Sequence, residues 1–175
     1  MSTIISAVII VAVIILIFWV LIAVHKNDLK KKAAGLIIRF NEVAYNNNLS
    51  VTETETLNDM VFGIDELYRK LLILESTGNN KYQHQIIDLD DIMYCTLQKN
   101  NRPVYEKGTS GQISEVFVEK VNLLFEFTDR REPYELVFYR HVVDHIFELP
   151  QLDQKAGKWQ ELISTKIKNP LRRIA

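Results

Sequence analysis

The sequence predicts an α+β protein with a single N-terminal transmembrane helix, a helical spacer, and an antiparallel β-sheet domain closed by a C-terminal amphipathic helix. Three observations support this fold class. Residues 3–24 are apolar or uncharged throughout, apolar and polar residues alternate along much of 80–140, and the period changes after Pro150. The expected parts are 1–25 as transmembrane anchor, 26–48 as juxtamembrane helix, 49–168 as folded domain and 169–175 as basic tail.

The uncharged stretch of residues 3–24, TIISAVIIVAVIILIFWVLIAV, is long enough as a helix to cross a hydrocarbon layer of roughly 30 Å. A cleaved secretory signal is disfavoured, because no lysine or arginine precedes the stretch and no small-residue cleavage site ends it. Basic residues follow the stretch, and such residues favour the cytoplasmic side. The sequence therefore predicts a single-pass cell-membrane protein, in a bacterial inner membrane, with its N-terminus outside and its C-terminal domain in the cytoplasm.

The segment after the spacer allows two interpretations. A helical stripe of apolar residues runs through 52–76, but Gly63 and the polar pair that follows Ile64 interrupt it. We favour two strands, Met60–Ile64 and Lys70–Leu74, joined by a turn. Before this segment, the asparagine run at 46–48 is expected to end the helical spacer, because asparagine tolerates left-handed conformations.

The later strands and the last helix follow from periodicity. A long strand is expected within 116–128, where alternate residues are apolar, and a returning strand begins at Tyr134 after a charged turn. Two shorter strands, Gln85–Asp88 and Asp91–Gln98, precede them, and residues 107–111 form a loop. After Pro150, Asp153 is expected to cap a helix that Pro170 stops. Its apolar residues, at spacings of three and four, are Ala156, Trp159, Leu162, Ile163 and Ile167.

This order of elements resembles the pleckstrin-homology-like (PH/GRAM) superfold. The run Gly63–Glu66 followed by Arg69–Ile73 looks like the first hairpin of that fold, IIDLDDIMY at 86–94 looks like the next strand-turn-strand, and Trp159 looks like the tryptophan of the closing helix. The resemblance implies a partly open β-barrel plugged by the C-terminal helix. It does not imply one activity, because function resides in sites and not in folds.

Lipid headgroup binding by the barrel is disfavoured by charge. Residues 49–154 carry 10 basic and 19 acidic side chains, a net charge of −9, which an anionic membrane surface repels. The flanks are basic, so the predicted membrane-surface contacts lie there instead. These residues are Lys26, Lys30, Lys31, Lys32, Lys166, Lys168, Arg172 and Arg173.

Three clusters could be reactive or metal sites. His141 and His145 have a helical metal-ligand spacing, but no further ligands complete a zinc site, and a solvated turn is favoured. The aspartates of 88–91 lack the pattern of a calcium loop and suit a turn whose side chains bond the local backbone. Cys95 has no nearby cation to activate it and lies in an apolar run typical of a buried thiol.

The favoured function is a membrane-tethered cytoplasmic protein-interaction module. No phosphate-binding or nucleophile-elbow motif is present, so an enzyme is the less favoured class and no cofactor or metal is expected. The expected partners are a lipid bilayer, through residues 3–24, and a protein; neither nucleic acid nor a small-molecule ligand is expected. Two alternatives stay open: an accessory subunit of a membrane complex, and a membrane-bound metal-dependent hydrolase using His141 and His145.

Overall fold

The computed structural model describes residues 15–16, 18–19, 31–57, 59–78, 81–105 and 113–167. The chain divides into two compact units. The first comprises Met1–Gly63 with Leu72–Gln85, and the second comprises Ile64–Leu71 with Ile86–Ala175. Each unit is described by itself below.

Four strands form the first sheet in the order β1-β2-β3-β4. They are β1 (Val51–Leu57), β2 (Met60–Asp65), β3 (Lys70–Gly78) and β4 (Lys81–Asp88). Successive strands are neighbours joined by connections of only a few residues, and such short connections fit antiparallel pairs alone. This settles the ambiguous segment of the sequence: the two predicted strands are confirmed and the helical alternative is wrong.

Gly63 has a packing role in the first unit. A Cβ atom on this residue would lie 2.6 Å from the carbonyl oxygen of Glu53 and 2.6 Å from Cγ1 of Val51, both in β1. Real Cβ atoms do not approach other atoms this closely, so β1 lies against β2 at a point where only glycine fits. The interruption that argued against a helix in the sequence is therefore a close approach of two backbones.

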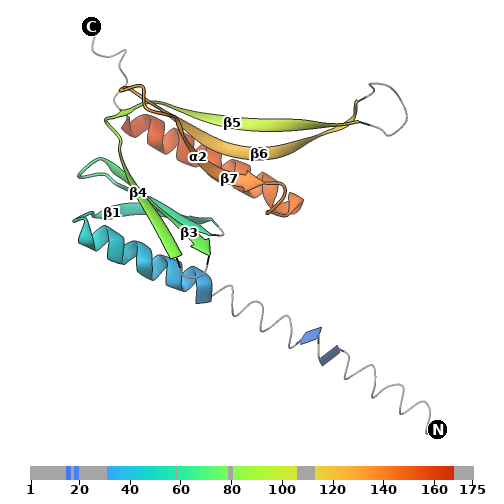
Figure 1. Ribbon diagram of the computed structural model, residues 1–175, viewed down its shortest axis with the longest axis horizontal. Helices are drawn as coiled ribbons and strands as arrows, with labels where there is room; N and C mark the ends of the chain where they lie inside the picture. Colours follow the sequence, from blue (N-terminus) through green and yellow to red (C-terminus); the bar gives the residue numbers. More distant parts are fainter. Residues whose placement is uncertain are drawn as a thin grey trace, which may run out of the picture. The chain divides into compact units, whose positions relative to one another are not determined.

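The helix of residues 31–46 belongs to this first unit and is not a bare spacer (Figure 1). Four of its apolar side chains are buried, at spacings of four, three and one: Leu36, Phe40, Val43 and Ala44. The predicted asparagine stop is confirmed, because Asn48 has a φ of 54° and the side-chain amide of Asn47 donates to the Val43 carbonyl at 2.8 Å.

Three strands form the second sheet in the order β5-β6-β7: β5 (Ile92–Tyr105), β6 (Ile113–Phe127) and β7 (Tyr134–Arg140). Both pairs are antiparallel. The inward face of β6 carries Val121, Leu123 and Phe125, each fully buried. The predicted long strand and its returning partner are confirmed, whereas β4 and β5 are longer than the two strands predicted there.

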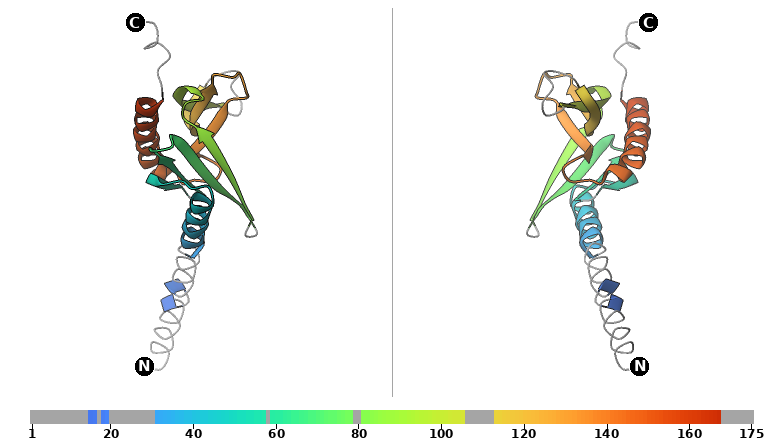
Figure 2. Two further views of the ribbon diagram at one scale, coloured as in Figure 1. Left: turned by 90° about the vertical axis from the view of Figure 1, so that its left-hand side faces the viewer. Right: turned by 90° about the vertical axis from the view of Figure 1, so that its right-hand side faces the viewer.

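The connection after β7 contains a short 3₁₀ helix, η1 (Ile146–Glu148), and leads into α2 (Leu149–Lys166). Both views of Figure 2 show α2 as one continuous helix. Ala156, Trp159 and Ile163 are its buried residues and face the second sheet. The predicted helix is thus present, but Asp153 does not cap it: α2 begins four residues earlier, and the Asp153 carboxylate pairs with Lys99 Nζ at 2.8 Å.

Two parts of the predicted fold class are corrected by the structure. The strands form two separate sheets of four and three strands, and no closed barrel is present among the described residues. No helix in the described part of the chain is long and apolar enough to span a membrane. Most of residues 3–24, where the transmembrane helix was predicted, lie outside the described residues, and the location in a membrane stays a prediction.

Candidate functional site

The segment between β7 and α2 exposes four large apolar side chains. We call residues 141–148 the apolar connection. Val142 and Phe147 are each 92% exposed, Val143 is 65% exposed and Ile146 is 54% exposed. None of the three residues of η1 is buried. Single exposed apolar residues are ordinary, but several within one short segment are typical of an interaction site.

Backbone hydrogen bonds order the apolar connection. The backbone N–H groups of Val143 and Asp144 donate to the Arg140 carbonyl at 2.9 and 2.8 Å. In return, the Asp144 carboxylate accepts a hydrogen bond from the Arg140 backbone N–H at 2.7 Å. Val142 and Val143 are therefore presented on a defined turn. Ile146 and Phe147 lie in η1, where the Glu148 backbone N–H donates to the His145 carbonyl at 2.9 Å. Such local order lowers the entropy cost of binding.

The side chain of His141 is engaged at the start of the apolar connection. Its Nδ1 lies 3.1 Å from the Tyr139 hydroxyl, and its ring centroid lies 4.6 Å from that of Phe117 in β6. Tyr139 is buried, and burial, followed by the negative charges of Asp144 and Glu148, raises the pKa of its hydroxyl. Tyr139 is therefore neutral at physiological pH and positions the imidazole.

The two histidines do not converge on a metal site in the described part of the chain. No group of three or more histidine, cysteine, aspartate or glutamate side chains there has the arrangement of a metal site. His141 instead contacts Phe117 and Tyr139. The geometry around these residues gives no support to the hydrolase alternative.

A second cluster lies at the C-terminal end of α2, and Arg69 is its centre. Arg69 has a φ of 55° in the turn between β2 and β3. Its guanidinium donates to the Asp90 carboxylate, with Nη2 2.8 Å from Oδ1, and to the Lys166 carbonyl at 2.5 Å. Lys166 Nζ pairs with the Glu66 carboxylate at 2.9 Å. Carbonyls at a helix C-terminus lack partners within the helix, so Arg69 satisfies one of them.

The Arg69 cluster explains why the predicted first hairpin does not present free basic charge. Lys70 Nζ lies 3.7 Å from the Asp88 carboxylate, and Arg69 is paired with Asp90. The aspartate turn predicted at this point is confirmed, since the backbone N–H of Asp90 donates to the Asp88 carboxylate at 2.9 Å. Both basic residues of the hairpin thus serve to hold the turns together.

The structure places three of the predicted membrane-surface residues. Lys31 and Lys32 are exposed on the helix of residues 31–46, and Lys166 belongs to the Arg69 cluster. The others lie outside the described residues: Lys26, Lys30, Lys168, Arg172 and Arg173. Contact of these residues with a membrane surface stays a prediction.

Cys95 lies inside the second sheet, as the sequence predicted for a buried thiol. Its side chain is 7% exposed. Burial raises the pKa of the thiol from an ordinary 9.0 to about 12. The thiolate is the reactive form, so this environment does not favour Cys95 as a nucleophile at neutral pH.

Comparisons of the chain with family models, with curated proteins and with solved structures found no match. The resemblance to the pleckstrin-homology-like superfold therefore stays a prediction. The four-plus-three order of the strands, followed by a C-terminal helix, is a finding about this chain alone.

The apolar connection was not predicted from the sequence. From the sequence alone, the stretch around His141 and His145 suits a solvated turn because no further ligands complete a zinc site, and its apolar residues are not considered. A signal was present in HVVDHIFELP: four large apolar residues, Val142, Val143, Ile146 and Phe147, lie close together where a strand ends and a helix begins. Their spacings of three and four fit one face of a helix, so periodicity alone does not show that they are exposed.

Proposed function

We propose that this protein is a protein-interaction module that docks its partner on the apolar connection. The observation that supports the proposal is the near-complete exposure of Val142, on the turn that the Arg140 carbonyl closes, and of Phe147, in η1. Burying one such side chain in an interface is worth about 1.5–3 kcal/mol. Clusters of this kind supply the central contacts of interfaces, with polar groups at the rim.

The partner surface is expected to carry positive charge around an apolar centre. Residues 49–154 have a net charge of −9, and two of the three formally charged side chains between 140 and 148 are Asp144 and Glu148. Complementary charge speeds association and suppresses wrong partners. A basic protein surface with exposed apolar residues is thus the partner class that we infer.

Quantitative affinity purification tests this function. The tagged full chain would be extracted in mild detergent, because residues 3–24 are uncharged, and the recovered proteins would be quantified by mass spectrometry. We would compare the native protein with F147D and with L67D. Leu67 is a matched control, because it is 74% exposed but lies in the turn between β2 and β3.

We expect a partner that the native protein and L67D recover equally and that F147D recovers about tenfold less, which corresponds to about 1.4 kcal/mol. Equal recovery of every protein by all three chains would contradict the proposal. Loss with L67D alone would move the docking surface to the other turn.

A further inference from the structure

Strand β6 extends well beyond the end of its neighbour β7. It pairs with β5 from Tyr105–Ile113 through to Ile92–Phe127, but with β7 only from Lys120 to Phe125. The His141 backbone N–H adds one more bond, to the Glu119 carbonyl at 2.9 Å. Among the described residues, no strand lies on that side of β6 from Ile113 to Val118.

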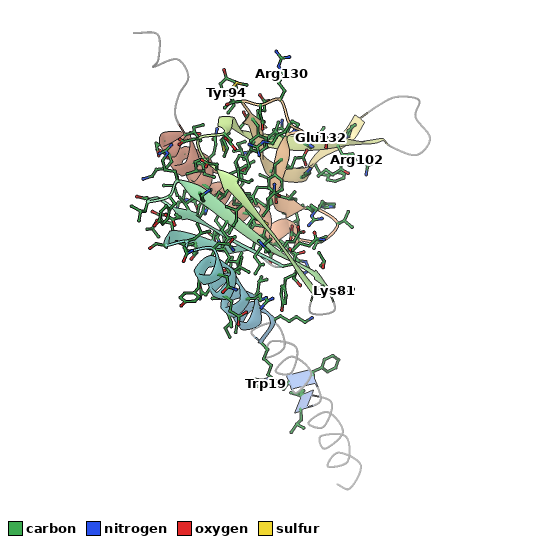
Figure 3. All side chains as sticks on the ribbon, turned by 60° about the vertical axis from the view of Figure 1, so that its left-hand side comes forward. Trp19, Lys81, Tyr94, Arg102, Arg130 and Glu132 are labelled. Carbon is green, nitrogen blue, oxygen red and sulfur yellow. The ribbon has the colours of Figure 1, made fainter. Side chains whose placement is uncertain are left out.

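The extension is a two-stranded ribbon with an open edge. In Figure 3, Arg102 lies on this part of β5, whereas Tyr94 and Arg130 lie at the opposite end of the same sheet. A two-stranded ribbon is marginally stable, and an open edge carries backbone groups that a further strand can satisfy. The ribbon is thus a template for a third strand.

The two edges of the ribbon differ in how well they accept a strand. Pro103 of β5 lies opposite Val116 of β6. Proline has no N–H group, and natural sheets place it on edges where no strand is to be added. The opposite edge, Ile113 to Val118 of β6, contains no proline. The edge of β6 is therefore the better acceptor.

The open edge of β6 adjoins the apolar connection. The ring of Phe117, within the open edge, contacts the ring of His141, the first residue of the apolar connection. Val116 is 61% exposed beside it. A strand that pairs with β6 here would therefore also reach apolar side chains that are now exposed. Backbone hydrogen bonds to β6 and contacts with these apolar side chains would then both bind the same ligand.

We propose that the partner binds as an extended segment that adds a strand to β6 along Ile113–Val118 and packs apolar side chains on the apolar connection. Backbone bonds supply affinity in this mode and alternate side chains supply specificity. The acidic residues Asp144 and Glu148 select lysine or arginine between the apolar residues of the segment. This inference rests on the proposed function and adds the conformation and chemistry of the partner.

Peptide selection on the full chain tests the inference before any partner has been identified. A phage library of random twelve-residue peptides would be selected in parallel on the native protein and on F147D. We expect enriched peptides in which apolar residues alternate with lysine or arginine. Hydrogen exchange of the full chain should then show slower exchange in β6 at 113–118 when the enriched peptide is bound.

N-methylation of the backbone of the enriched peptide provides a control, because it changes the ligand and leaves the protein itself unchanged. Alternate N–H groups of a bound strand face β6, so methylating one set should weaken binding about tenfold or more, and methylating the other set should leave it nearly unchanged. A helical or irregular ligand would not show this alternation.

The outcomes separate the two proposals. Peptides with apolar residues at helical spacing, or peptides that slow exchange only at 142–147, would overturn strand addition and leave the apolar connection as the docking surface. Peptides enriched equally on F147D, or no enrichment at all, would contradict both proposals.

Discussion

The two ends of helix α2 are built differently. At its C-terminal end, the Arg69 guanidinium donates to the Lys166 carbonyl, and Lys166 pairs with Glu66. At its N-terminal end, no side chain caps the helix and η1 buries no residue. One end is fixed by the fold, and the other presents apolar side chains to solvent. We infer that the N-terminal end is left free for a partner.

Loss of the Arg69 side chain, which holds the C-terminal end of α2, should have the largest effect on stability. R69A loses the bonds to Asp90 and to the Lys166 carbonyl, and we expect the free energy of unfolding to fall by about 1–3 kcal/mol in chemical denaturation. The side chain is one-third exposed, so solvent screening favours the lower part of that range.

R69G separates the side chain from the backbone. Glycine loses the same bonds but accepts the φ of 55° at no steric cost. We therefore expect R69G to be more stable than R69A by up to about 1 kcal/mol. If both variants match the native protein, the C-terminal end of α2 is not held by Arg69 and the contrast between the ends disappears.

The buried thiol of Cys95, which lies near the centre of α2, should make stability depend on pH in the alkaline range. Gln160 of α2 lies near the backbone of Cys95, with its side-chain nitrogen 3.4 Å from the Cys95 carbonyl oxygen. Above about pH 9 the unfolded chain loses the thiol proton, whereas the folded protein keeps it until about pH 12. The unfolded state then binds fewer protons, so stability falls by about 1.4 kcal/mol per pH unit between these values.

C95A provides the comparison, because other groups also titrate in this range. As the pH rises from 9 to 12, the free energy of unfolding should fall more in the native protein than in C95A, which has no thiol to ionise. Thiol labelling at pH 8 should be about a thousandfold slower in the folded than in the unfolded protein, from the change in pKa alone. A constant difference and rapid labelling would show that the thiol is accessible.

The free end should tolerate substitution with the smallest effect on stability. The side chain of Phe147 is 92% exposed, so F147D should change the free energy of unfolding by less than about 0.5 kcal/mol in urea denaturation. A loss above about 2 kcal/mol would show that Phe147 packs within the fold, and the affinity comparison with L67D would then report folding instead of docking.

Local periodicity predicted the elements of this protein better than their assembly. The alternation in β6 and the spacing of Ala156, Trp159 and Ile163 in α2 each express burial on one face, which a sequence shows directly. Closure of strands into a barrel depends on stagger and strand pairing over long distances, and no periodic signal encodes it. That part of the prediction was wrong.

The Arg69 cluster and the exposed residues of the apolar connection were harder to predict, for two physical reasons. Arg69 and Lys166 are 97 residues apart, and nothing local to either residue indicates that they meet. A solvated turn was expected around His141 and His145, but the sequence does not show that the apolar side chains of Val142 and Phe147 are exposed within it, because apolar residues are more often buried.

Site-specific photo-crosslinking in cells tests the central claim most directly. A photoreactive phenylalanine analogue would replace Phe147 in one chain and Leu67 in another, since both positions are exposed and lie in different connections, η1 and the turn between β2 and β3. We predict a discrete adduct with a second protein from position 147, abolished by V142D in the same chain, and none from position 67. Equal adducts from both positions, or an adduct that V142D leaves intact, would contradict docking on the apolar connection.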